Sequence, residues 1–238
     1  MTESEWLDCN NPRLMLRHLR RPLGRDWWTT WYRLPNRVPR KWRLFAVACC
    51  RRLRRLNRHE GMLLDFVETV ADSPAGKVDW DATEVECKRL ASFCRHSWST
   101  TDVYYGGLTA NVAGHVRREI ARRAASKYKG SQNPVVQGWI LNGERCRQAD
   151  LLRDIFGNPF SPVSTNPTWL TPSVITLAPA AYEERPLPSG ELDTARLAVL
   201  ADALEEAGCH DTDILGHLRS PGPHVRGCWV LDALLGKS

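Results

Sequence analysis

Hydrophobic residues recur at steps of three and four along most of the chain, which is the spacing that places side chains on one face of an α-helix. In the segment 41–57, for example, Trp42, Phe45 and Cys49 fall on one such face. Strand-like alternation of apolar and polar positions is nearly absent. The chain is therefore predicted to be all-α, and the helical pattern covers residues 41–57, 61–71, 79–98, 109–128, 144–156, 173–185, 192–207, 211–219 and 225–235.

Single residues mark where several of these helices begin and end. Asp79 or Asp81, and later Asp211 or Thr212, are residue types that accept hydrogen bonds from the first free N–H groups of a helix. Gly157 follows the helical stretch 144–156 directly, and glycine is the residue that most often ends a helix in the left-handed conformation. The sequence thus predicts helix starts near residues 79 and 211 and a helix stop at residue 157.

Turn-forming residues divide the helices into groups. Residues 129–138 collect Gly, Ser, Asn and Pro and indicate a break, and the Pro-rich segment 158–172 indicates an irregular crossover before the C-terminal helices. We predict a compact multi-helix assembly, packed as one globular unit. It consists of a basic, Trp- and Arg-rich helical region, a turn or linker, and a C-terminal helical module, at residues 1–130, 131–143 and 144–238.

Size and composition are those of a folded protein. The chain has 238 residues, of which 42% are hydrophobic and 25% charged, so it can bury a core without disulfide bonds. The first residues carry acids and no apolar run, unlike a secretory signal. The longest uncharged stretch, residues 155–182, is interrupted by prolines and does not resemble a membrane span. Eight cysteines without an export signal favour a reducing compartment, and we expect a cytoplasmic protein without membrane contact.

Charge is distributed unevenly along the chain, whose net charge is +6. Residues 37–58 hold nine basic residues and no acid, whereas residues 183–238 hold ten acids against five bases. The two halves can therefore attract each other within one chain or between copies. We expect the basic face to meet an acidic protein partner or a second copy of the chain.

The same region also suggests an alternative, direct binding of nucleic acid. Guanidinium groups pair with phosphates, and exposed aromatic rings stack on unpaired bases. Against this, 27 of the 33 basic residues are Arg, a bias that genome base composition alone can create, and tryptophans are also good core residues. The candidate nucleic-acid-binding residues are Trp27, Trp28, Trp31, Arg51, Arg52, Arg54, Arg55 and Arg58.

A second alternative is a zinc site near the C-terminus. Cys209, His217, His224 and Cys228 lie within twenty residues of one another, and their side chains are zinc ligands. The spacing is not that of paired CxxC motifs, however. A cysteine beside Trp229 also fits a small core residue, and the histidines also fit roles at helix caps or turns. Zinc is thus the one cofactor that the residues suggest.

Sequence motifs of enzymes are missing from the chain. It contains no GxSxG nucleophile elbow, no glycine-rich phosphate loop and no HExxH zinc motif. The acids near residues 202–213 fit the solvated face of an amphipathic helix. We therefore predict a non-enzymatic helical interaction or adaptor module, with nucleic-acid binding and a C-terminal zinc site as the two alternatives.

Several segments resemble one protein family. These are the MTESEWL start, RLFAVACCRRL at 43–53, LLRDIFGNPFSPV at 151–163 and LADALEEAGCHDTDILGHLRSPGPHVRGCWVLDALLGK at 200–237. They resemble a large paralogous family of uncharacterised bacterial proteins, and LADALEEAG is also similar to a short segment that accompanies repeat domains. The resemblance covers both ends of the chain and implies no particular activity. The Trp- and Arg-rich stretch 20–40 departs from the family pattern.

Overall fold

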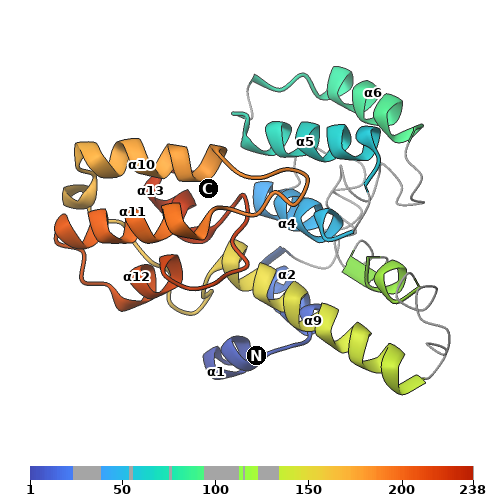
Figure 1. Cartoon of the computed structure of the whole chain (residues 1–238), viewed down its shortest axis with the longest axis horizontal. Coiled ribbons are helices and arrows are strands. Elements are labelled where there is room, and N and C mark those ends of the chain that lie inside the picture. The colour runs from blue at the N-terminus through green and yellow to red at the C-terminus, as the bar shows by residue number, and fades with distance from the viewer. Residues whose placement is uncertain are drawn as a thin grey trace.

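The computed structural model describes residues 1–23, 39–53, 56–74, 77–93, 113–114, 116–122 and 134–237. These ranges are mainly helical, which confirms the all-α prediction; they also contain one isolated bridge, between Glu191 and Val225. The helices in Figure 1 are α1 (Glu3–Asp8), α2 (Pro12–Arg20), η1 (Arg21–Leu23), α4 (Arg40–Arg51), α5 (Arg58–Asp72), α6 (Trp80–Ala91), α9 (Pro134–Phe156), η4 (Pro167–Trp169), α10 (Pro172–Glu183), α11 (Thr194–Glu206), α12 (Thr212–Leu218) and α13 (Trp229–Leu234). Residues 116–122 are helical as well.

Polar side chains fix the starts of these helices by accepting hydrogen bonds from backbone N–H groups that have no partner within the helix. Asp79 accepts from the backbone N–H of Ala82 at 3.0 Å, and Asp211 accepts from the N–H groups of Asp213 and Ile214. Both predicted N-caps are therefore confirmed.

Helix α9 ends where the sequence predicts and begins earlier. Gly157 has a φ of +66°, and a Cβ at this position would lie 3.1 Å from the ring of Trp229, so only glycine fits without strain. At the other end, residues 134–143 of the expected linker are helical. Pro134 explains this difference, because a proline in the first turn of a helix loses no hydrogen bond and has a suitable φ.

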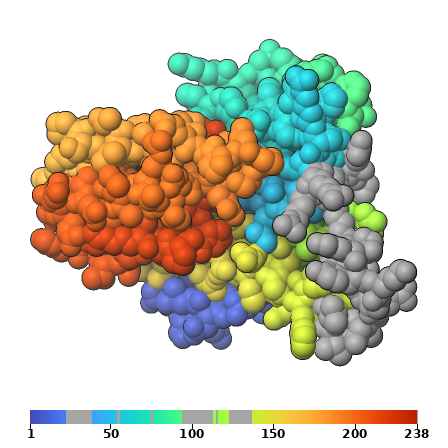
Figure 2. Space-filling view, in the orientation of Figure 1, coloured from blue at the N-terminus to red at the C-terminus, as the bar shows by residue number. Residues whose placement is uncertain are grey.

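The buried apolar side chains form two hydrophobic clusters. The first cluster unites α1, α2, α4, α5 and α6 with Ala113, Val116 and the C-terminal part of α9. The second cluster is built by α10, α11, α12 and α13. Figure 2 shows the surface of α10–α13 as a lobe beside α4 and α5. Helix α9 packs on α2, α4 and α13, while the helices after the Pro-rich crossover pack mainly on one another.

None of the helices in these described ranges combines the length and the apolar character that crossing a lipid bilayer requires.

Buried ion pairs connect the two clusters. Arg40, at the start of α4, contacts Asp232 of α13 at 2.6 Å and Asp72 of α5 at 2.7 Å, and it donates a hydrogen bond to Tyr182 of α10. Asp72 also pairs with Arg226 at 2.7 Å. Burial alone would raise the pKa of Asp72, but the charges of the surrounding cations outweigh this effect and lower it. The interface therefore favours the ionised carboxylate of Asp72.

A second ionic group lies nearby on the same interface. Arg51 of α4 pairs with Glu68 of α5 at 2.8 Å and donates to the carbonyl oxygen of Pro188 at 3.1 Å, in the loop between α10 and α11. Arg185 of the same loop also pairs with Glu68. The loop is thereby held against α4 by hydrogen bonds as well as by charge.

We predict that Asp72→Asn lowers the free energy of unfolding by about 3–5 kcal/mol at neutral pH, because it leaves buried guanidinium groups without their counter-charge. The folded-state pKa of Asp72 is lowered, so its contribution is present above the unfolded pKa of about 4 and is lost as the pH falls below it. Denaturant titrations should therefore show the largest difference between wild type and variant above about pH 5, shrinking in acid.

Asp202→Asn is the matched control. Asp202 also pairs with an arginine, Arg219, but its side chain is 67% exposed, whereas that of Asp72 is 9% exposed. The control should leave the free energy of unfolding unchanged within error, because exposed ion pairs contribute little. Equal losses in both variants would contradict a special role for the buried network.

Candidate metal centre

Four side chains with metal-binding atoms converge between the two hydrophobic clusters. Asp154 comes from the last turn of α9, His217 from α12, His224 from the loop after α12, and Cys228 from the residue that precedes α13. One potential ligand atom from each of them lies within 4.8 Å of all the others. Asp154, His224 and Cys228 are buried, and His217 is partly exposed.

The four side chains contact one another through one atom each. Asp154 Oδ1 lies 2.9 Å from His224 Nδ1 and 3.1 Å from His217 Nε2. His217 Nε2 also lies 3.2 Å from the sulfur of Cys228. The contacts thus run from His224 through Asp154 and His217 to Cys228, and Oδ1 of Asp154 and Nε2 of His217 each face two of the other groups.

Neighbouring groups hold the site in place from outside. The backbone N–H of Val225 donates to Asp154 Oδ2 at 2.8 Å, which leaves Oδ1 for the histidines. His224 Nε2 lies 3.1 Å from the carbonyl oxygen of Ser220. The same nitrogen also lies 3.1 Å from the hydroxyl of Ser220, so Nε2 either donates to the carbonyl oxygen or accepts from the hydroxyl, and Nδ1 faces Asp154 in both cases. Contacts of this kind orient the ligands in metal sites.

A protonated His224 satisfies both of its contacts, because Nδ1 then donates to Asp154 and Nε2 donates to the carbonyl oxygen of Ser220. With the hydrogen on Nε2, a neutral imidazole would direct the lone pair of Nδ1 at the carboxylate oxygen, which is repulsive. Either a second proton on His224 or a metal cation removes the repulsion. A proton and a metal ion would thus occupy the same point between His224 and Asp154.

The pKa shifts in the site have opposite directions. Burial would raise the pKa of Asp154, but the hydrogen bonds and charges of His217 and His224 lower it. Burial would lower the pKa of His224, but its hydrogen bond with Asp154 and the charge of that carboxylate raise it. For Cys228, burial and the charge of Asp154 raise the pKa of the thiol well above its usual range. A metal ion would be needed to convert this thiol into a thiolate.

A cysteine, histidine and aspartate in contact also raise the question of nucleophilic catalysis. In a catalytic triad the histidine uses one ring nitrogen for the nucleophile and the other for the carboxylate. Here Nε2 of His217 faces both Cys228 and Asp154. Burial also keeps the Cys228 thiol protonated and covered. The geometry therefore fits a metal site better than a nucleophile.

The structure brings together three of the four residues expected to bind zinc. Cys209 is not among them: it lies buried in the second hydrophobic cluster, where it acts as a small apolar residue. Asp154 takes the fourth place, which sequence reasoning missed. Its signal was an acid on the apolar stripe of a helix, between Leu151 and Ile155, where an unpartnered charge is unfavourable.

The structure describes only some of the candidate nucleic-acid-binding residues. The described residues do not include Trp27, Trp28, Trp31, Arg54 and Arg55. Arg58, at the start of α5, is exposed.

Arg51 and Arg52 do not lie on the expected free basic face, because their guanidinium groups are held by acids inside the protein. Arg51 pairs with Glu68 and Asp65. Arg52 forms a bidentate salt bridge with the buried carboxylate of Glu144. Its Nε donates to Oε1 and its Nη2 donates to Oε2, each at 2.9 Å. The charges of these two arginines are thus used in packing α4 against α5 and α9.

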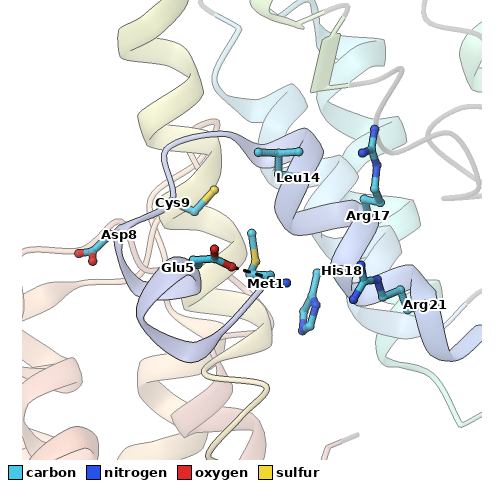
Figure 3. Close-up of a pocket in the computed structure, with 8 residues that line it drawn as sticks. All are labelled: Met1, Glu5, Asp8, Cys9, Leu14, Arg17, His18 and Arg21. Carbon is cyan, nitrogen blue, oxygen red and sulfur yellow. Dashed lines mark ion pairs between the residues drawn. The ribbon is translucent and has the colours of Figure 1, made fainter.

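A pocket of about 450 Å³ lies elsewhere, between α1 and α2. Figure 3 shows Met1, which precedes α1, and Glu5 of α1 on one side of it and His18 of α2 on the other. The pocket also contains the exposed side chains of Arg17 and Asp8. The residues that line the pocket include both acids and bases, and they do not form a cluster of potential ligands like that of the candidate metal centre.

Comparisons of the chain with protein-family models, curated proteins and solved structures find no match. The resemblance of the two ends of the chain to a bacterial family therefore stays a prediction. What supports a function is the geometry of Asp154, His217, His224 and Cys228.

We predict that Asp154→Asn lowers the free energy of unfolding of the chelator-treated protein by about 3–5 kcal/mol, because His224 loses its buried counter-charge. Asp150→Asn, on the same helix, is the control: Asp150 pairs with Arg153, but its side chain is 45% exposed. Denaturant titrations of both variants at neutral pH measure the difference. Similar values for the two would show that the carboxylate of Asp154 has no structural role.

Proposed function

We propose that the protein is a non-enzymatic helical interaction module whose C-terminal helices are fastened to α9 by a structural zinc ion. The observation that carries this proposal is the convergence of Asp154, His217, His224 and Cys228, from four separate segments, within 4.8 Å. This meeting of a carboxylate, two imidazoles and a thiol between two apolar clusters supplies four ligand atoms of the types that zinc binds.

The donor atoms favour zinc over other common ions. Zinc takes nitrogen, sulfur and carboxylate oxygen in tetrahedral sites, whereas calcium and magnesium prefer oxygen alone. Zinc–ligand lengths of about 2.0–2.3 Å place tetrahedral ligands roughly 3.3–3.6 Å apart. The three contacts of 2.9–3.2 Å would need to lengthen by a few tenths of an ångström, and the other ligand atoms, which lie within 4.8 Å of one another, would need to move closer. The carboxylate of Asp154 and the thiolate of Cys228 would then neutralise the two charges of the ion.

A structural role fits better than a catalytic one. Catalytic zinc sites keep a coordination position open for water or substrate, whereas structural sites have four protein ligands. Here four protein groups are present, and three of them are buried. Because Asp154 belongs to α9 and Cys228 to the start of α13, the ion would connect the two hydrophobic clusters.

We expect wild-type protein to bind about one Zn²⁺ per chain, and Cys228→Ala to weaken binding by more than about 100-fold, because losing even an outer-shell partner costs about 10- to 100-fold. Metal content after removal of excess ion measures the stoichiometry. Substitution with Co²⁺ should give a thiolate-to-metal charge-transfer band that Cys228→Ala removes.

Cys209→Ala is the matched control, because Cys209 is also a buried thiol but lies outside the site. It should keep the metal and the cobalt band. Zinc should also raise the unfolding temperature of wild type and of Cys209→Ala, since a ligand bound to the folded state alone stabilises it. Wild-type protein that binds no metal, or an equal loss in both variants, would overturn the proposal.

The partner of the module would contact a narrower basic face than the sequence suggests, because Arg40, Arg51 and Arg52 are committed to internal acids. An acidic protein or a second copy of the chain is the partner that we propose, with nucleic acid as the alternative. The cysteines among the described residues are free thiols. This supports a reducing compartment such as the cytoplasm as the place of action.

A further inference from the structure

One wall of the pocket between α1 and α2 is a single face of α2 and of the η1 turn that continues it. The volume of about 450 Å³ is that of a pocket for a small molecule, for which roughly 300–1,000 Å³ is typical. Residues three, four and seven positions apart share one face of a helix. The lining residues with this spacing are Leu14, Arg17, His18 and Arg21. The face therefore combines an apolar side chain, an imidazole and two guanidinium groups.

The two arginines of this face carry charges that no acid neutralises within the described parts of the chain. Arg17 and Arg21 are exposed, and neither forms an ion pair there. They differ in this respect from Arg40 and Arg51, which buried acids hold inside the protein. Because guanidinium groups bind oxyanions most strongly, an anion from outside the chain is the partner that these two side chains lack.

The acids that line the pocket do not compete for these arginines. Glu5 belongs to the capping box at the start of α1, where its Oε2 accepts a hydrogen bond from the backbone N–H of Thr2 at 2.8 Å. Figure 3 shows Arg21 extending towards the space beside His18, whereas Asp8 points away from that space. The free charge that faces the pocket is therefore positive.

Aromatic contacts hold His18 in this wall. Its ring stacks on that of Phe160, in the Pro-rich crossover, with 4.9 Å between the ring centroids, and its centroid lies 6.3 Å from that of Trp6. Nδ1 of His18 is buried, and among the described residues it has no hydrogen-bond partner. Most buried polar atoms of native proteins have a partner in the protein or in a bound molecule. This nitrogen is thus a contact point for a polar ligand group.

Both walls of the pocket are attached to α9. On the α1 side, Trp6 Nε1 donates a hydrogen bond to the carbonyl oxygen of Gly157 at 3.1 Å, and Arg153 donates to the carbonyl oxygen of Cys9. On the other side, α2 packs directly on α9. The pocket is therefore formed before a ligand arrives, and preorganised groups bind more tightly because less conformational freedom is lost.

We propose that this pocket binds a small organic anion with an oxyanion head and an aliphatic body. Guanidinium groups donate in a planar fork that matches the oxygens of a carboxylate or a phosphate, so Arg17 and Arg21 would hold the head. Met1 and Leu14 also line the pocket, and an aliphatic body that covers them removes apolar surface from water. A carboxylate and a phosphate head present the same chemistry to the arginines, and the choice of probes distinguishes them.

The pocket is separate from the proposed metal centre. None of the residues that line it belongs to the group of Asp154, His217, His224 and Cys228. Binding of the anion should therefore persist in folded Cys228→Ala protein, so the two proposals can fail independently.

The test uses the full chain and four probes at physiological salt, measured by isothermal titration calorimetry: octanoate, octyl phosphate, 1-octanol and acetate. Octanoate or octyl phosphate should bind with a Kd below about 1 mM, as expected for a ligand of this size, and the tighter of the two identifies the head. Acetate lacks the aliphatic body and 1-octanol lacks the charge. Each should therefore bind at least about tenfold more weakly than the tighter anion.

The double variant Arg17→Gln and Arg21→Gln should weaken binding of the tighter anion by about 10- to 100-fold, the range expected for lost hydrogen bonds between charged groups. Both side chains are exposed, so the fold should survive. The matched control is Arg13→Gln with Arg147→Gln, which removes the same charge from exposed arginines that do not line the pocket. It should change the affinity by less than about twofold. No binding of either anion, equally tight binding of 1-octanol or acetate, or an equal loss in the control would overturn the proposal.

Discussion

The requirement that buried charges be neutralised governs how the two hydrophobic clusters meet. Asp72 of the first cluster lies among Arg40, Arg226 and Tyr182, and Glu68 lies between Arg51 and Arg185. Because an unpaired charge in this position is strongly unfavourable, each of these acids restricts how α10–α13 can dock. Apolar burial drives the helices together, while the ion pairs select one arrangement.

The candidate metal centre is part of the same interface and obeys the same requirement. Asp154 is a buried acid of α9 whose partners, His217 and His224, come from the segments that follow α11. The surroundings of Asp72 and Asp154 differ in which groups supply the positive charge beside the carboxylate. Guanidinium groups balance Asp72 permanently, whereas the imidazole and thiol groups around Asp154 can exchange protons for a metal ion. One interface thus contains a fixed ionic contact and a group of side chains that could hold a metal ion.

The arginines show how far sequence alone supports a functional reading. The helix caps Asp79 and Asp211 and the stop at Gly157 depend on local geometry, and the sequence predicts them correctly. The basic run, by contrast, indicates a positive face, yet Arg51 and Arg52 turn inward. Whether an arginine meets an acid depends on residues such as Glu68 and Glu144, far away in the chain. No local pattern contains that information.

The sequence by itself determined the class of the fold, several helix ends, the Pro-rich crossover and three candidate ligands, His217, His224 and Cys228. These follow from periodicity, capping chemistry and ligand type, which act over a few residues. Only the tertiary structure decided that Asp154 joins them, that Cys209 does not, and that Arg51 and Arg52 meet buried acids. The physical reason is that helix packing brings distant segments together, and only then do charge and burial select their partners.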